Sequence, residues 1–165
     1  MAGDLFIKLG DITGESKADG HAGEIELMSW SWGSSQSGST RGIGGLTAGK
    51  VNVQDLTFTK LVDAATHSII AAVCGGTSFP LATLTCEKSA GNGKKPVQYL
   101  KIKLKDVLVS SHSMGGAEGS QSHTETVTLN FGAIETTYTP MNQDGTGGAA
   151  KTSAHSVVKG TNKFE

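Results

Sequence analysis

The sequence contains little of what a disulfide-stabilised or metal-dependent protein needs. It has two cysteines and three prolines, aromatic residues make up 5% of it, and charged residues make up 18%. Cys74 and Cys86 are too far apart for a Cys-x-x-Cys motif and both have apolar neighbours, so we expect two buried, reduced thiols rather than a disulfide. A chain of 165 residues buries about 70% of the surface that its unfolded form exposes, so it needs neither a disulfide nor a metal ion to fold.

Charge and hydropathy exclude two classes of partner. The formal net charge is -1, which gives no overall attraction to nucleic acid or to an anionic membrane. No apolar stretch is long enough to span a bilayer. The first residues, Met1–Asp4, lack the basic start and apolar run of a signal peptide. We therefore expect no nucleic-acid partner, no membrane insertion and no cleavable signal.

Glycine, in contrast, is abundant. The 23 glycines gather between patterned segments, mainly at residues 42–49, 75–76, 91–93, 115–119 and 145–148. That placement is typical of turns and loops. The segment 34–49 is rich in Ser and Gly and poor in large apolar residues, and a loop of that length inside a compact domain is often functional.

Alternating apolar and polar residues predict a mainly β protein. Strands are expected at residues 5–9, 24–32, 51–60, 79–88, 100–105 and 125–131. The phase of the alternation changes near Gln54–Asp55 and at Gly132, which indicates bulges. Alternating lysines at 101, 103 and 105 predict a strand with a basic outer face, either solvated or paired with a neighbouring subunit.

One segment has helical spacing. Val62, Ala65, Ile69 and Val73 repeat at helical intervals, and Gly75–Gly76 is the expected stop.

Several antiparallel strands, repeated phase changes and a single helix favour a closed antiparallel β-barrel with one α-helix packed on its side. We expect one domain over residues 1–165. It would have an extended loop at about 34–49 and a polar tail, from about residue 140, that is mobile or tied to a neighbouring chain.

Motifs that carry catalysis are incomplete. Gly42–Thr47 resembles a dinucleotide-binding loop but lacks its last glycine and its β-α-β context. His123 and Glu125 have the spacing of a zinc deaminase motif without its Pro-Cys-x-x-Cys partner, and their shared strand face favours a surface hydrogen-bonding pair. No serine lies in a Gly-x-Ser-x-Gly elbow. We predict no catalytic residue, no metal and no cofactor, although a metal site assembled from the scattered histidines stays open.

The strand at 24–32 carries apolar residues on both faces. Trp30 and Trp32 share one face with Met28, and their expected role is to anchor the core or a subunit interface rather than to stack on a ligand. Ser29 and Ser31 lie on the opposite face.

Several stretches, in this order and spacing, resemble one known family. They are Phe6-Ile7-Lys8, Gly14-Glu15-Ser16-Lys17, Trp30-Ser31-Trp32-Gly33, Ser35-Gln36-Ser37-Gly38-Ser39, Gly49-Lys50-Val51-Asn52-Val53-Gln54-Asp55, Phe58-Thr59-Lys60, Val107-Leu108-Val109-Ser110-Ser111 and Val127-Thr128-Leu129-Asn130-Phe131. Together they resemble the Hcp (haemolysin-coregulated protein) family of type VI secretion over about residues 4–140. The tail departs from the family pattern.

The resemblance implies a compact β-barrel with one helix on its side, which assembles into homohexameric rings. It further implies that the rings stack into the secreted tube of a type VI secretion system and carry small effector proteins in the lumen. Spike and sheath components are the other implied partners. The protein would reside in the bacterial cytoplasm before assembly and then leave through the apparatus.

Particular residues are candidates for these contacts. By resemblance Ser31 matches a lumen-facing position, and Ser29 shares its strand face, so both are expected to contact effectors. The candidates for ring or tube contacts are Gln36, Ser37, Arg41, Ile43, Leu46, Trp30 and Trp32. Two alternatives to a self-assembling ring stay open. One is a monomeric β-barrel that binds a sugar or a peptide, and the other is a hydrolase with a dispersed site.

Overall fold

The computed structural model describes residues 3–39, 47–91 and 93–165. The contacts predicted for Arg41, Ile43 and Leu46 therefore lie outside the described residues. The elements are β1 (Gly3–Leu9), β2 (Ile25–Glu26), β3 (Ser29–Ser31), β4 (Ser34–Ser39), β5 (Thr47–Val53), β6 (Leu56–Leu61), α1 (Thr66–Gly75), β7 (Ser78–Lys88), β8 (Val97–Gly115), β9 (Thr124–Asn130), β10 (Ala133–Tyr138) and β11 (Lys151–Ser156). The prediction of a mainly β protein with one helix is confirmed for the described part of the chain.

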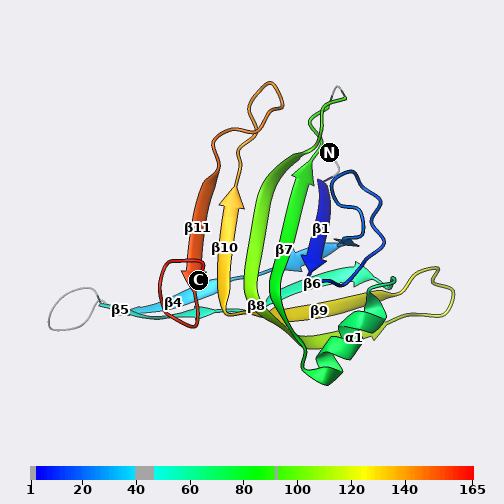
Figure 1. The fold of residues 1–165 in the computed structure, drawn as a ribbon, viewed down its shortest axis with the longest axis horizontal. Coiled ribbons are helices and arrows are strands. Elements are labelled where there is room, and N and C mark those ends of the chain that lie inside the picture. Colours follow the sequence, from blue (N-terminus) through cyan, green and yellow to red (C-terminus); the bar gives the residue numbers. More distant parts are fainter. Residues whose placement is uncertain (1–2, 40–46, 92) are drawn as a thin grey trace.

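Nine of the strands form one antiparallel sheet, built around the long strand β8. The first part of β8 pairs with β7 on one edge and β10 on the other, and its last part, from Leu108, pairs with β9. The order continues through β9 to β6 and β3, and through β7 to β1 and β2. Figure 1 shows β1, β7, β8, β10 and β11 standing side by side, with β6 and β9 crossing beneath them.

The two ends of this sheet are close in sequence. β2 pairs with β1 and β3 pairs with β6, and no ladder joins β2 to β3 in the described residues. The closed barrel that we predicted is therefore not shown. The amide of Leu27 donates to the Leu5 carbonyl (2.9 Å) and that of Met28 to the Thr59 carbonyl (2.8 Å). The predicted strand at 24–32 is thus two short strands, because the chain changes ladder between these two residues.

β8 turns from the upright strands to the crossing strands at Asp106, whose φ of 52° lies in the left-handed region. Gly132, between β9 and β10, lies against this corner. A Cβ atom at Gly132 would be 3.3 Å from the Asp106 Cβ, tighter than most side-chain contacts. The Gly132 amide donates to the Lys105 carbonyl (2.8 Å). The irregularity that we predicted at Gly132 is therefore the corner itself.

The core lies between the upright and the crossing strands and beneath α1. Its fully buried large side chains include Ile7, Leu9, Ile25, Leu56, Phe58, Ile69, Leu84, Ile102, Leu104 and Leu129. Each contributes roughly 1.5–3 kcal/mol of transfer free energy. α1 packs against β8 and ends as predicted, because Gly76 adopts φ 63° and ψ 32°. Val62 precedes the helix rather than starting it and is 41% exposed.

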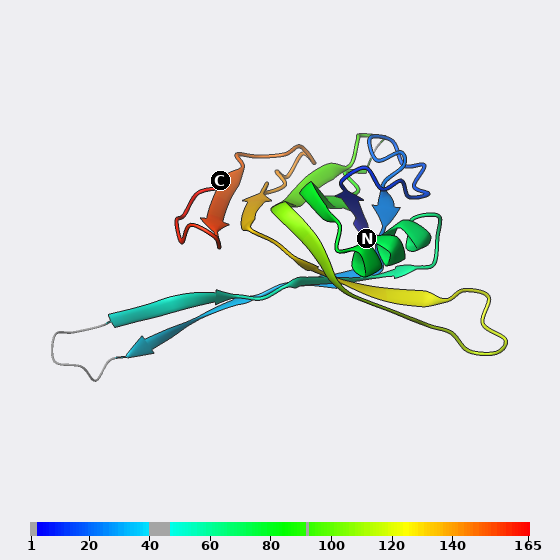
Figure 2. The same ribbon diagram turned by 60° about the horizontal axis from the view of Figure 1, so that its bottom comes forward.

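Residues 34–39 and 47–49, which we expected in a loop, belong to a strand pair. β4 and β5 continue the β3–β6 pair outward, and the Gln54 amide donates to the Gly33 carbonyl (3.0 Å) at the junction. Gln36 Nε2 also donates to the Gly49 carbonyl (2.8 Å). Figure 2 shows this pair, which we call the arm, projecting far from the body. The predicted irregularity at Gln54–Asp55 is the break between β5 and β6.

Two further expectations need correction. The tail is not simply a mobile or partner-bound segment, because β11 pairs along the whole of β10, from Ala133 with Ser156 to Tyr138 with Lys151. Only one of the two thiols is buried: Cys86 lies in the core, whereas Cys74 is exposed on the last turn of α1.

Candidate functional site: a hydroxyl face

Hydroxyl side chains cover the face of β3, β6, β9 and the last part of β8 that points away from the core. They form two rows across the four strands, set by the strand registers. The first row is Ser29, Thr59, Thr126 and Ser113, and the second row is Ser31, Thr57, Thr128 and Ser111. We call these residues the hydroxyl face.

The face follows from the period of two along each strand. In β6 the side chains of Phe58 and Lys60 are buried, so Thr57 and Thr59 point to the other side. β9 repeats the pattern, with its threonines alternating with buried residues. Threonine suits such positions because its β-branched side chain favours the strand conformation and its hydroxyl satisfies a polar surface.

The rows contain no charged side chain, and their hydroxyls bond to one another. Ser29 Oγ lies 2.6 Å from Thr59 Oγ1, and Thr57 Oγ1 lies 3.2 Å from Thr128 Oγ1. Because part of the hydrogen-bonding capacity is used within the rows, this surface offers a passing protein only weak, uncharged contacts.

The two ends of the hydroxyl face differ. Beyond the second row lies Asp55, whose carboxylate accepts hydrogen bonds from Ser110 (2.9 Å) and Asn130 (2.8 Å). Beyond the first row lies Leu61, which is 44% exposed and pairs with Thr124. The face therefore runs from an acidic end to an apolar end.

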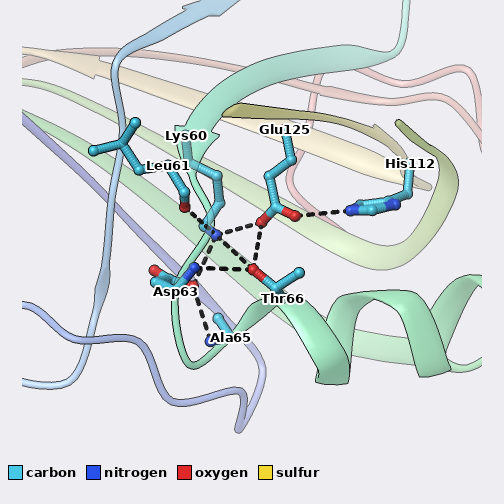
Figure 3. Close-up of polar contacts among 7 residues, drawn as sticks. All are labelled: Lys60, Leu61, Asp63, Ala65, Thr66, His112 and Glu125. Carbon is cyan, nitrogen blue, oxygen red and sulfur yellow. Dashed lines mark hydrogen bonds and ion pairs between the residues drawn. The ribbon is translucent and has the colours of Figure 1, made fainter. Parts of the chain in front are cut away.

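A buried charge cluster lies on the core side of the same strands (Figure 3). Lys60 Nζ donates to the carboxylates of Glu125 and Asp63, the latter at 2.8 Å, and to the Leu61 carbonyl at 2.8 Å. Glu125 also accepts from Thr66 Oγ1 (3.0 Å), the first residue of α1, and pairs with His112 Nε2 (2.8 Å).

The contacts within the cluster lower the pKa of Glu125. Burial by itself would raise the pKa of Glu125, but the hydrogen bonds from Lys60 and His112 and the charge of Lys60 outweigh it, so this pKa lies below its ordinary value. Our prediction of a surface pair between His123 and Glu125 is wrong. Glu125 is 1% exposed and pairs with Lys60 and His112, whereas His123 precedes β9 and is exposed.

A second polar cluster fixes the segment between β1 and β2. His21 is 3% exposed, and its two ring nitrogens lie 2.7 Å from carboxylate oxygens of Glu24 and Glu87. Its ring stacks on Phe6 with centroids 4.3 Å apart. Burial lowers the pKa of His21, but the two carboxylates outweigh it and raise the pKa above 6.5. Within the described ranges, no three His, Cys, Asp or Glu side chains are arranged to hold a metal ion.

The structure brings some predicted site residues together and separates others. Ser29 and Ser31 are exposed on the hydroxyl face, and Trp30 and Trp32 are half-buried against the core. Met28, expected to be buried with the tryptophans, is 56% exposed because the chain changes ladder there. Gln36 and Ser37 lie on β4, in the arm.

Sequence reasoning missed most of the hydroxyl face. The signal was present as alternating hydroxyl residues in three more segments, namely 57–59, 111–113 and 126–128. This alternation indicates a common surface only once the strand order is known, because that order places these segments next to Ser29 and Ser31.

Comparison with known proteins identifies the family of this chain. The family model described as "Type VI secretion system effector, Hcp" matches residues 6–138. The chain belongs to the Hcp family. Protein hcp1 of Pseudomonas aeruginosa is 51% identical over 145 residues, which is 88% of this chain and 88% of that protein.

Solved Hcp-like structures share the fold. "Structure of a type six secretion system protein" has a TM-score of 0.91 and 29% identity, with 98% of this chain and 100% of that chain covered. Hcp1 from Salmonella typhimurium has a TM-score of 0.80 and 31% identity, with 99% and 100% covered. The family match spans β1 to β10, so it includes the whole hydroxyl face and ends before β11. In the described part of this Hcp-family chain, the helix lacks the length and apolarity needed to cross a bilayer.

Proposed function

We propose that this Hcp-family chain is the ring-forming tube subunit of a type VI secretion system and that its hydroxyl face lines the lumen. The observation that carries the proposal is the pair of uncharged hydroxyl rows across four strands. A tube must hold its cargo without trapping it, and a surface of self-paired hydroxyls is weakly adhesive.

Unpaired strand edges support ring formation. Within the described residues, β3 pairs with β6 alone, and β8 beyond Val109 has β9 on one edge and no strand on the other. These edges are different surfaces at opposite sides of the crossing strands. Joining unlike edges of identical copies is a heterologous contact, which generates a ring when the rotation closes. It would also cover edges that otherwise invite aggregation.

A groove between the arm and β11 also suits a subunit contact. Trp32, Val51 and Val53 line it from one side and β11 lines it from the other. The Trp32 indole N–H is buried and has no acceptor among the described residues. A buried donor without a partner costs roughly 1–3 kcal/mol, and an acceptor from a neighbouring copy would remove that cost.

The wider function follows from the ring. Homohexameric rings would stack into the inner tube, contact the spike and sheath components, and leave the bacterial cytoplasm with small effectors inside. The proposed role is structural rather than catalytic, in keeping with the Hcp family to which the chain belongs.

Light scattering coupled to gel filtration tests the proposal. We expect a mass near six times the 17.0 kDa of one chain at micromolar concentration. A monomer under these conditions would overturn the ring and favour the alternative of a monomeric β-barrel binding module.

A further inference from the structure

The upright strands also have a face that points away from the core (Figure 1). In β8, Lys101, Lys103 and Lys105 alternate with buried residues, so they point to this face, and the basic outer face predicted from the sequence is confirmed. Lys8 of β1 points the same way, because the residues on either side of it are buried. We call these four lysines and the surface between them the lysine face.

The strand register places three of these lysines close together. Lys8 and Lys103 both pair with Thr83 of β7, one from each side. Neighbouring strands lie about 4.8 Å apart, so these two backbone positions are about 10 Å apart. Lys101 is two residues from Lys103 along β8. Like charges at such distances repel one another, because salt screens them only partly.

Little acidic charge offsets this repulsion. Lys103 lies 3.9 Å from Glu135, and Lys105 donates to the Phe164 carbonyl (3.3 Å). Lys8 and Lys101 form no ion pair with any side chain that the structure describes. A gathering of unpaired lysines in a chain of net charge -1 indicates a surface that is complementary to an acidic partner.

A groove beside Lys8 adds an apolar surface to the lysine face. Its volume is about 750 Å³, and Lys8, Phe79, Pro80 and Leu81 are among its lining residues. Asp11 is the acidic residue that lines it. Leu81 is 41% exposed, and Pro80 is exposed beside it. A partner that fits both the lysines and this groove therefore carries carboxylates next to apolar side chains.

The place of the lysine face restricts the partner further. The core lies between the upright and the crossing strands, so the lysine face and the hydroxyl face are on opposite sides of the subunit. With the hydroxyl face on the lumen, the lysine face is on the outside of the ring. Effectors in the lumen cannot reach it, and a spike meets only the end of a tube. A sheath that encloses the tube would cover this surface in every ring.

We propose that the lysine face and its groove bind an acidic, amphipathic segment of the sheath component. Carboxylates of this segment pair with Lys8, Lys101 and Lys103, and its apolar side chains cover Leu81. The inference rests on the proposed function and assigns a surface and a chemistry to one of its partners. Each exposed ion pair is weak by itself, but its repetition in every subunit holds the tube while allowing its release.

Charge reversal in cells tests the contact. We expect Lys8→Glu/Lys103→Glu to keep the ring mass and to lower the number of extended, fluorescently labelled sheaths per cell about tenfold, because attraction becomes repulsion in every subunit. Lys8→Arg/Lys103→Arg keeps the charge and should stay within about twofold of the wild type. The matched control is Lys95→Glu, because Lys95 is 90% exposed and lies outside the lysine face. It should leave the sheath number unchanged.

The apolar part of the surface has its own variant. Leu81 is exposed, so Leu81→Ser should keep both the fold and the ring mass while lowering the number of extended sheaths. An unchanged number in this variant would remove the groove from the proposed contact.

The outcomes separate the docking from the ring. Wild-type sheath numbers in Lys8→Glu/Lys103→Glu, or an equal loss in Lys95→Glu, would overturn the docking alone. Loss of the ring in the double variant would place these lysines in a subunit interface and would overturn it too. A monomeric wild type would instead overturn the ring proposal, and the docking with it.

Carbodiimide cross-linking, which joins a lysine amine directly to a carboxylate that it contacts, gives a second readout. In purified extended sheath–tube particles, mass spectrometry should find Lys8, Lys101 or Lys103 linked to aspartate or glutamate of the sheath. Sheath links confined to lysines outside the lysine face would contradict the docking. Wild-type rings that bind a short DNA duplex at physiological salt, with the binding lost in Lys8→Glu/Lys103→Glu, would assign the face to nucleic acid instead.

Discussion

Ser29 and Thr59 face each other across β3 and β6 with their hydroxyl oxygens 2.6 Å apart. The pair is exposed, so it adds little to the stability of the fold. Its effect is on the surface. Because the two hydroxyls hydrogen-bond to each other, each has less hydrogen-bonding capacity left for a passing protein. The same relationship recurs between Thr57 and Thr128 in the next row.

A long side chain on this face should disturb cargo and leave the ring intact. Ser31 is exposed at the end of the second row, next to Thr57. Ser31→Gln should keep the ring mass, because no core packing changes, and lower the retention of at least one co-expressed effector. Light scattering and co-purification measure the two effects. Loss of the ring would place Ser31 in a subunit interface, and full retention of every effector would show that it is not a cargo contact.

Shortening the arm should separate folding from assembly. Replacing Gln36 to Leu46 by a short Gly-Ser linker removes the end of β4, whose residues 36–38 are exposed, together with the segment that follows it. The unfolding free energy should stay within about 0.5 kcal/mol of the wild type, as for other surface changes. Within the described residues, β4 and β5 pair only with each other, so we expect the arm to contact another copy. Ring assembly and secretion should therefore fall. Normal secretion of this variant would show that the arm is dispensable.

The strands that carry a buried face could be predicted from the sequence. In β6 and β9 every second residue is buried, so hydrophobic alternation marks them clearly. The helix stop at Gly76 could be predicted for a local reason, the left-handed conformation that glycine adopts readily.

The arm and the buried charges could not be predicted, for two different reasons. β4 consists of Ser, Gln and Gly with solvent on both faces, so no alternation identifies it as a strand. Lys60 and Glu125 are far apart in sequence, and a charged residue in an alternating strand normally indicates the solvent face. Only the β6–β9 register brings the two together on the core side.

Stability should fall as pH rises through the pKa of His21. Protonated His21 can donate to Glu24 and Glu87 at once, and its pKa in the fold is raised above 6.5. The folded state therefore binds the proton more tightly than the unfolded state. This contribution is complete below about pH 6.5 and disappears above the raised pKa.

Urea unfolding from pH 6 to pH 9 would measure this slope. His21→Gln should remove it, whereas His67→Gln, which changes an exposed histidine on α1, should retain it. An identical pH dependence in wild type and His21→Gln would contradict the assignment.

Replacing Lys60, the buried cation beneath the hydroxyl face, should lower the free energy of unfolding far more than replacing a lysine on the surface. Lys60→Met keeps most of the aliphatic stem but leaves Glu125, which is 1% exposed, without its main positive partner. Breaking a buried pair in this way costs about 3–5 kcal/mol of unfolding free energy. Lys103→Met is the matched control, because Lys103 is 42% exposed and lies 3.9 Å from Glu135. It should cost at most about 1 kcal/mol.

The double variant Lys60→Met/Glu125→Gln decides whether the unpaired charge causes the loss. Glutamine removes the charge and can still accept a hydrogen bond from Thr66, so the double variant should recover part of the stability lost in Lys60→Met. Urea unfolding of the four proteins at pH 7 gives the coupling free energy between the two side chains. A coupling near zero would mean that the loss comes from packing around Lys60 rather than from its charge. Thr59 and Thr126 of the hydroxyl face are the chain neighbours of Lys60 and Glu125. We therefore also expect the ring formed by Lys60→Met to be less stable than the ring formed by the double variant.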